Sequence, residues 1–268
     1  MINIIPVVFG LIIGSFVNVL IFRLPSNASI VRPASHCLVC QNKLKWWLNI
    51  PVISFIILRG KCSFCSHKIS LQYPLIELAC AGIFILIFDI SRPFITAGLC
   101  LSFSFLLAIA VIDLRHFIIH HSLLAAAFIC LLPTVLRPGF IWQYHVAGMI
   151  FCPGFIWLVS QSVKLMNKRD NLGGGDILLG IVIGVYLGPY LSMLMYSLAS
   201  ILGIGYWLLA SKAKEAGKDS VPIPFGTGMV TGMLVLEILL LPPFVSSFKF
   251  LEIIVFTDQF VAEMLSLL

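Results

Sequence analysis

Residues 171–180 read NLGGGDILLG, so three consecutive glycines lead into one acid, Asp176, and the acid opens an apolar run. Glycine lets a backbone or ligand approach closely, and an acid at the mouth of a membrane segment is costly enough to indicate function. An aspartate before an apolar run is also a favoured helix N-cap. The functional interpretation is favoured because a second acid, Asp113, closes an earlier apolar run.

The composition around this stretch is that of an integral membrane protein. Hydrophobic residues make up 60% of the chain and charged residues only 10%, against about 25% charged residues in ordinary globular domains. Apolar runs of about 20 residues indicate helical spans, and the alternating segments of a β-barrel are absent. The sequence predicts an all-α polytopic membrane protein with about eight transmembrane helices, at residues 4–22, 74–90, 94–113, 118–136, 141–163, 176–188, 190–210 and 222–245. The sixth segment is short and ends at Gly188 and Pro189, which predicts either half a span or a broken helix, and such segments are tolerated where they line a cavity.

Basic residues predict the orientation of these spans. With the N-terminus outside, the cytoplasmic segments hold fourteen of the 17 Lys and Arg residues, as the positive-inside rule requires. Asp113 and Asp176 then lie at the same depth, at the cytoplasmic edge. The basic excess predicts contact with anionic membrane lipid and gives no reason to expect nucleic acid. The first span lacks a basic segment before it and a small-residue cleavage site after it, so we expect a retained anchor.

A polar, basic insert at residues 26–73 carries two C-x-x-C pairs. Cysteines at this spacing predict a tetrahedral zinc site formed by Cys37, Cys40, Cys62 and Cys65. Two disulfides are the alternative, which a reducing cytoplasm disfavours. We expect four parts: a first anchor at 1–25, a cytoplasmic zinc-ribbon-like domain at 26–73, a transmembrane core at 74–245 that carries both aspartates, and an amphipathic or surface segment at 246–268.

Paired aspartates suit hydrolysis of a peptide bond at a membrane. Two carboxylates held close together do not both ionise easily, so one keeps its proton. The ionised acid removes a proton from water and the protonated acid polarises the scissile carbonyl. The structural alternative for Asp113 is an ion pair with Arg115.

The order and spacing of many motifs resemble those of the type IV prepilin peptidases, bifunctional membrane aspartic proteases with a G-x-G-D motif. These motifs are Gly14-Ser15-Phe16 with Asn18, Arg23-Leu24-Pro25, both C-x-x-C pairs, Asn49-Ile50-Pro51, Arg59-Gly60, Tyr73-Pro74-Leu75 with Glu77, Ile112-Asp113, Gly173 to Asp176, and Pro224-Phe225-Gly226. The resemblance implies that Asp113 and Asp176 form the catalytic pair. It also implies cleavage of a basic leader from type IV pilin or type II secretion pseudopilin precursors at the bacterial cytoplasmic membrane.

The same resemblance implies methylation of the new N-terminus by S-adenosyl-L-methionine. Gly14, Asn18 and Glu77 are the residues expected to bind that cofactor. A different interpretation of Gly14 and Asn18 stays open, because small and polar residues on neighbouring turns also serve helix packing.

Three positions depart from the pattern of the resembled family. Ile119-His120-His121 stands where the family commonly has Ile-Pro-Asp or Ile-Pro-Asn, Leu178 stands where lysine is frequent, and Thr227 stands where proline is usual. Two other functions remain as alternatives: a catalytically silent zinc-ribbon membrane protein that binds pilus-assembly components, and a proton-coupled carrier. A carrier is expected to hold its acids near the middle of the membrane.

Overall fold

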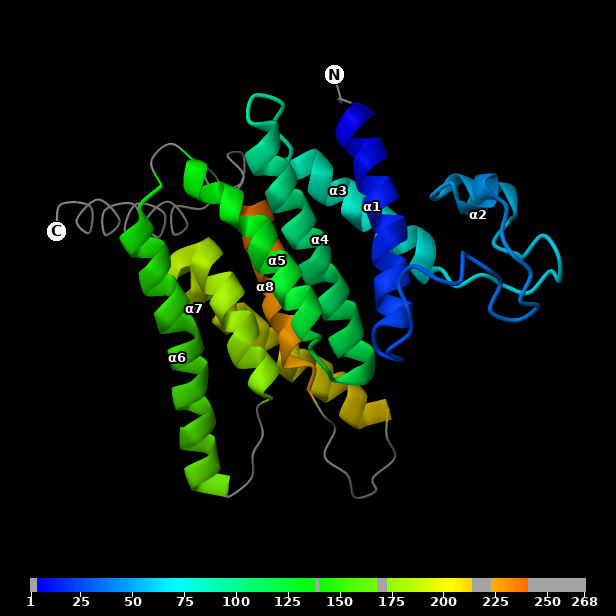
Figure 1. Cartoon of the computed structure of the whole chain (residues 1–268). Helices are drawn as coiled ribbons and strands as arrows, with labels where there is room; N and C mark the ends of the chain where they lie inside the picture. Colours follow the sequence, from blue (N-terminus) through cyan, green and yellow to red (C-terminus); the bar gives the residue numbers. More distant parts are fainter. Residues whose placement is uncertain (1–3, 138–139, 168–172, 214–222, 241–268) are drawn as a thin grey trace. The chain divides into compact units, whose positions relative to one another are not determined.

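The computed structural model describes residues 4–137, 140–167, 173–213 and 223–240, and all the regular elements in these ranges are helices (Figure 1). The chain divides into two compact units. Unit 1 comprises Met1–Ala108 with Ile129–Thr134, and unit 2 comprises Ile109–Phe128 with Val135–Leu268.

In unit 1, helix α1 (Ile4–Arg23) packs closely against α3 (Gln72–Ile87). A Cβ atom added at Gly10 would lie 2.6 Å from the Cα of Ala81, and one added at Gly14 would lie 2.5 Å from the Cα of Glu77. The two backbones therefore touch along a stripe of small residues, as in many helix pairs in membranes. This contact gives Gly14 a packing role, in agreement with the structural alternative.

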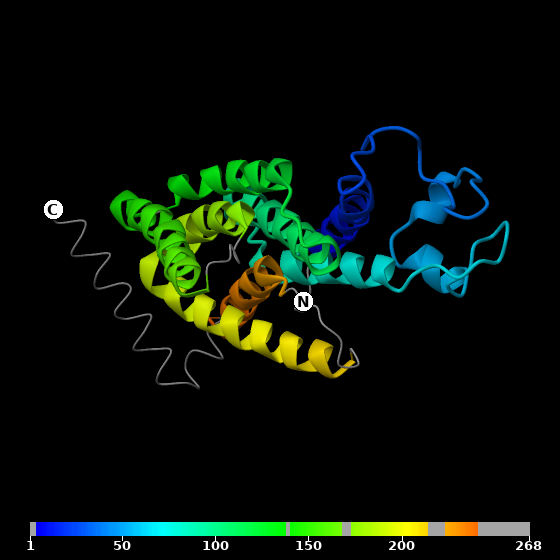
Figure 2. The same cartoon turned by 90° about the horizontal axis from the view of Figure 1, so that it is seen from below.

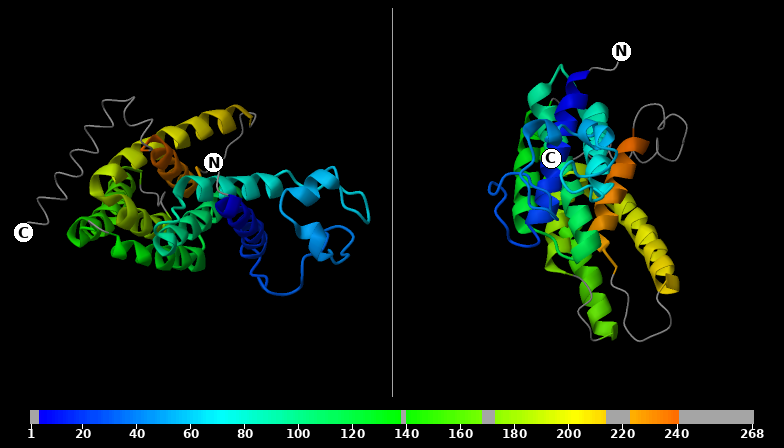
Figure 3. Two further views of the ribbon diagram at one scale, coloured as in Figure 1. Left: turned by 90° about the horizontal axis from the view of Figure 1, so that it is seen from above. Right: turned by 90° about the vertical axis from the view of Figure 1, so that its right-hand side faces the viewer.

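The insert between α1 and α3 contains only two short helices, η1 (Trp46–Asn49) and α2 (Ile53–Ile57). It extends to one side of α1 and α3 in Figure 1 and in the left panel of Figure 3. Several of its apolar side chains are exposed, among them Trp46, Ile56 and Ile57. The predicted zinc ribbon has no strands among the described residues, only the isolated bridges of His36 with Lys43 and of Lys61 with Lys68.

Unit 2 is built around α6 (Trp142–Asn167), α7 (Gly174–Ala213) and α8 (Phe225–Leu239). A Cβ atom on either Gly148 or Gly184 would overlap the backbone of the other, so α6 and α7 cross at a glycine contact. Helix α7 changes direction at Gly188, whose φ of 72° and ψ of −178° are not helical (Figure 2). This break confirms the interruption predicted at Gly188 and Pro189.

Helix α8 carries a half-buried acid, Glu237, that has a partner. The hydroxyl of Tyr186 in α7 donates a hydrogen bond of 2.8 Å to Glu237 Oε2. A charged side chain inside a membrane segment requires such an interior partner.

Four described helices are long and apolar enough to cross a membrane: α1, α4 (Pro93–His116), and the stretches Trp142–Leu165 of α6 and Gly174–Ala210 of α7. Three further apolar segments are shorter, namely α3, α5 (His121–Leu131) with η2 (Leu132–Leu136), and α8. The polytopic helical class is thus supported, while the count of eight spans stays a prediction. The predicted surface segment at 246–268 lies outside the described residues.

Candidate active site and metal centre

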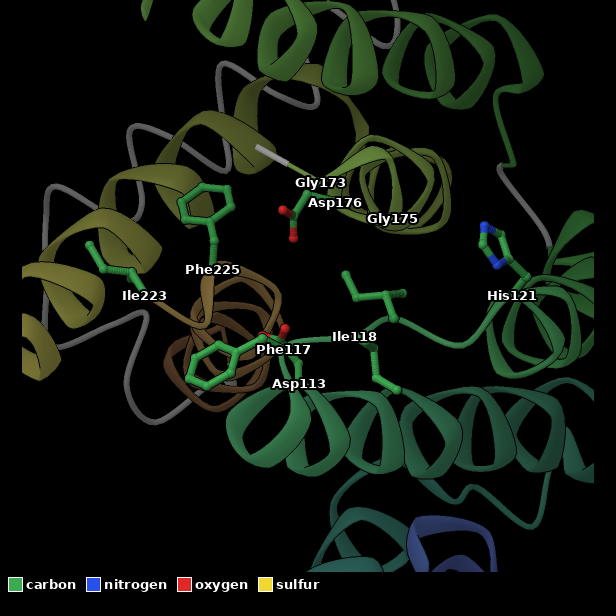
Figure 4. A pocket seen from close by; sticks show the side chains of 10 residues that line it. Asp113, Phe117, Ile118, His121, Gly173, Gly175, Asp176, Ile223 and Phe225 are labelled. Carbon is green, nitrogen blue, oxygen red and sulfur yellow. The ribbon is translucent and has the colours of Figure 1, made fainter. Parts of the chain in front are cut away.

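Asp113 and Asp176 line the same pocket in unit 2, which has a volume of about 390 Å³. Figure 4 shows the two carboxyl groups pointing toward one another across it. Asp113 comes from the last turns of α4 and Asp176 from the first turn of α7. Two acids that are far apart in the sequence therefore meet, as the catalytic interpretation requires.

The surroundings of the two acids differ. Asp113 is only 5% exposed, and its Oδ2 atom accepts hydrogen bonds from the backbone N–H of Thr227 at 2.7 Å and from the Thr227 hydroxyl at 2.9 Å. Asp176 is half-buried, and its own backbone N–H donates to the Gly173 carbonyl at 3.1 Å. Within the described residues, the hydrogen bonds to Asp113 come from Thr227, whereas the structural alternative had expected an ion pair with Arg115.

The glycines before Asp176 differ in what surrounds them. A Cβ atom at Gly175 would lie 2.8 Å from the Cβ of Ile119, whereas Gly174 has open space around it. On α8, a Cβ atom at Gly226 would lie 2.9 Å from Ile119 Cδ1 and 3.2 Å from Asp113 Oδ2. The loop that carries Ile119 is therefore in close contact with the starts of α7 and α8.

Alanine at Gly175 should lower activity at this site at least about tenfold, while alanine at Gly174 should leave it within about twofold. The added methyl group at position 175 must displace Ile119, and misplacing reacting groups by about 1 Å is enough to cost activity of this order or more. Steady-state rates of the two purified variants check this, with the position-174 variant as the matched control. Equal rates for the two variants would contradict the packing argument.

The rest of the pocket wall is mainly apolar: Phe117, Ile118, Ile119, Ile223 and Phe225 line it together with His121. Phe117 adopts a positive φ of 55° directly after α4, the left-handed conformation that often ends a helix. Of these residues, the sequence had singled out Phe225 in the Pro224-Phe225-Gly226 motif, and Ile119 and His121 only as departures from the family pattern. It gave no sign of Phe117, Ile118 and Ile223.

The four cysteines of the insert converge in unit 1. Their sulfur atoms all lie within 4.8 Å of one another, with 3.9 Å between Cys37 and Cys65 and 4.0 Å between Cys40 and Cys62. Tetrahedral zinc with Zn–S bonds of about 2.3 Å places its sulfurs about 3.8 Å apart. All four are free thiols, so the disulfide alternative is not supported and the donor set fits a four-thiolate metal site.

The two halves of this centre repeat the same backbone geometry. The N–H of Cys37 donates to the Asn42 carbonyl, and the N–H of Cys62 donates to the His67 carbonyl. Gln41 and Ser66 occupy equivalent positions with φ of 58° and 57°. In sequence the two halves share only the C-x-x-C spacing and the lysine that follows it, Lys43 or Lys68, so the repeat is clear only in the structure.

Backbone N–H groups favour the thiolate form of one of the four cysteines, Cys37. Hydrogen bonds from the amides of Cys40 and then Val39 lower the pKa of Cys37 to about 6. A thiolate is the form that binds metal. The lowered pKa of Cys37 and the spacing of the four sulfur atoms therefore both favour metal binding.

The residues expected to bind S-adenosyl-L-methionine lie together on the facing sides of α1 and α3. The Asn18 side-chain amide donates to the carbonyls of Gly14 at 3.3 Å and Tyr73 at 3.1 Å. Glu77 Oε2 accepts a hydrogen bond of 2.7 Å from the backbone N–H of Val52 in the insert. Three buried polar atoms in this region have no partner among the described residues, namely Asn18 Oδ1 and both side-chain polar atoms of Gln72. Unpaired buried polar atoms fit a polar ligand.

Two facing carboxyl groups beside a glycine-lined helix start, in a helical membrane protein, define the class of membrane-embedded aspartic proteases. Comparison with known proteins specifies the family. Residues 8–90 match the Bacterial Peptidase A24 N-terminal domain, and residues 100–208 match the Type IV leader peptidase family. The chain belongs to this family of type IV prepilin leader peptidases.

Relatives match most of the chain. A prepilin leader peptidase/N-methyltransferase from Stutzerimonas stutzeri is 32% identical, with 82% of this chain and 84% of the relative covered. Proteins of the same name from Bacillus subtilis and Neisseria gonorrhoeae are 31% and 29% identical. The matches cover 85% of this chain and 90% of the Bacillus protein, and 74% of this chain and 78% of the Neisseria protein. No solved structure gives a significant match.

Proposed function

We propose that this chain removes the leader peptide from prepilin-like precursors and then methylates the new N-terminus. The observation that carries the proposal is the meeting of Asp113 and Asp176 in one pocket. The family membership and the printed function of the relatives support it. The apolar wall of the pocket suits an extended segment with apolar side chains, such as the phenylalanine that the family resemblance implies as the usual new N-terminal residue.

Catalysis by the pair uses one water molecule and one shared proton. The ionised aspartate takes a proton from water as the oxygen attacks the scissile carbonyl carbon, and the protonated aspartate donates to the carbonyl oxygen. When the tetrahedral intermediate collapses, the C–N bond breaks and the leaving amine takes a proton from the pair. The hydrogen bonds from Thr227 hold one carboxyl group in place during these steps.

The proposed location is the bacterial inner membrane, with the insert and both aspartates on the cytoplasmic side. Four membrane-length apolar helices and the family membership support the membrane. The distribution of basic residues supports the side. The exposed apolar side chains of η1 and α2 favour contact of the insert with membrane lipid.

Zinc is the metal proposed for Cys37, Cys40, Cys62 and Cys65, because the sulfur spacing and the thiolate donor set fit it. Its role is structural, since four protein ligands leave no open position for chemistry. S-adenosyl-L-methionine would supply the methyl group. The proposed contacts to it come from Gly14, Asn18 and Glu77, near the unpaired polar atoms of α1 and α3.

The function is tested with detergent-solubilised protein and a purified prepilin carrying its leader. Mass spectrometry should show loss of the leader in every reaction, and a further gain of one methyl group only when S-adenosyl-L-methionine is added. An unprocessed precursor would favour the silent zinc-ribbon alternative. Proton uptake by vesicles that contain the protein and no precursor would favour the carrier.

Glutamine at Glu77 should abolish methylation and keep leader cleavage within about threefold. The carboxylate is the charged group of the proposed cofactor site, and it belongs to unit 1, whereas the aspartate pair belongs to unit 2. Both products are read by mass spectrometry, and equilibrium dialysis with labelled S-adenosyl-L-methionine measures binding without any turnover. Full methylation and unchanged cofactor binding in this variant would remove Glu77 from the site, leaving its contact with Val52 as its role.

A further inference from the structure

Thr227 contacts the Asp113 carboxyl group through two donors. Its backbone N–H lies 2.7 Å from Asp113 Oδ2, and its hydroxyl oxygen lies 2.9 Å from the same atom. The hydroxyl also lies 2.9 Å from the carbonyl oxygen of Ala110, one turn earlier in α4. Because the hydroxyl has a single hydrogen, it donates to one of these two acceptors at a time.

The start of α8 explains why the amide of Thr227 is available. The first backbone hydrogen bond of this helix runs from the N–H of Gly228 to the Pro224 carbonyl, so the N–H of Thr227 has no partner inside the helix. Pro224 occupies the N-cap position and offers no capping side chain. Asp113 therefore supplies the acceptor that the helix start lacks, from a different helix.

These contacts make the two oxygens of the Asp113 carboxyl group different. Among the described residues, both donors to this group come from Thr227 and both meet Oδ2. Hydrogen bonds to an ionised group are about twice as strong as neutral ones and hold it in one orientation. Oδ1 receives no hydrogen bond from the described residues, so it is left for water or substrate in the pocket that Asp113 shares with Asp176.

We propose that Thr227 is a positioning residue of the proteolytic site, which fixes Asp113 Oδ2 and leaves Oδ1 as the oxygen that exchanges a proton with water or substrate. The inference rests on the proposed function of the aspartate pair. Neither donor is present in the proline that the resemblance led us to expect at this position. This chain therefore orients its first aspartate through the side chain and amide of a residue that departs from the family pattern.

Valine at position 227 tests the hydroxyl, because it keeps the branched shape and the amide and removes only the O–H donor. One charge-assisted hydrogen bond corresponds to about a 10- to 100-fold change in rate, so we expect kcat for leader cleavage to fall at least about tenfold with KM within about threefold. Serine restores the hydroxyl and should restore kcat to within about threefold. Thr231→Val is the matched control, because Thr231 lies one turn after Thr227 in α8. Its hydroxyl donates to the Thr227 backbone carbonyl and, among the described residues, to no carboxylate.

Infrared spectroscopy tests the contact without relying on turnover. The Asp113→Asn protein assigns the carboxyl band of Asp113, and Thr227→Val should shift that band while Thr231→Val leaves it in place. An unchanged band, full kcat in Thr227→Val, or equal losses in the valine and serine variants would overturn the positioning role. If Asp113→Asn itself keeps full cleavage, the proposed function fails instead, and the infrared shift still decides whether Thr227 holds this carboxyl group.

Discussion

Asparagine at either Asp113 or Asp176 will lower leader cleavage by about 100- to 10,000-fold, the range that general acid–base catalysis contributes. Asparagine keeps the size of the side chain but neither accepts nor delivers the proton that the reaction moves. The two carboxyl groups line one pocket and point toward one another. Each aspartate needs the other in the opposite protonation state, so loss of one disables the pair.

The double variant should be no slower than the slower single variant, because residues that act as a unit have effects that do not add. Initial rates on a purified precursor, measured for the two single variants and the double variant, check both expectations. Asp89→Asn is the control, since Asp89 is an exposed aspartate in the loop before α4 and contacts Ser91. Near-normal cleavage by a well-folded single variant would remove that aspartate from the catalytic role.

Serine at both Cys37 and Cys62 should reduce bound zinc from about one per chain to nearly none. Each change removes one thiolate from one of the two matching halves of the centre, and two remaining ligands do not hold structural zinc. The free energy of binding zinc at such sites is about 10–16 kcal/mol and contributes to folding. The insert should then unfold locally, because its two short helices bury little apolar surface.

Metal analysis of protein purified without chelators measures the first effect, and limited proteolysis within residues 26–71 measures the second. Cys130→Ser is the control, since Cys130 is a single cysteine outside the cluster. A double variant that keeps its zinc, or a metal-free protein whose insert resists proteolysis as well as the unmodified protein does, would contradict a structural zinc site.

The alternatives differ in what they require of the aspartates. A carrier needs them to bind and release protons across the membrane, and a silent assembly protein needs neither acid. The pocket favours hydrolysis because it places both acids in one cavity, which Gly173 and Gly175 at the start of α7 also line.

The sequence by itself determined the helical membrane class, and it singled out the four cysteines that cluster and the two aspartates that share a pocket. Each of these rests on a local property: the length of apolar runs, the C-x-x-C spacing, and an acid at the end of an apolar run. The break at Gly188 was predictable for the same reason, because a glycine followed by proline interrupts a helix wherever the segment packs. The domain limits and the number of spans remain predictions.

Only the tertiary structure decided how the pocket is held together. Thr227 and Asp113 are separated by 114 positions in the chain, and in the sequence Thr227 was noticeable only as a departure from a family pattern. Ile119 leaves no room for a Cβ atom at position 175, whereas a Cβ atom at position 174 would meet open space. These contacts depend on how the ends of α4, α7 and α8 meet, and no local pattern encodes the distance between side chains that far apart.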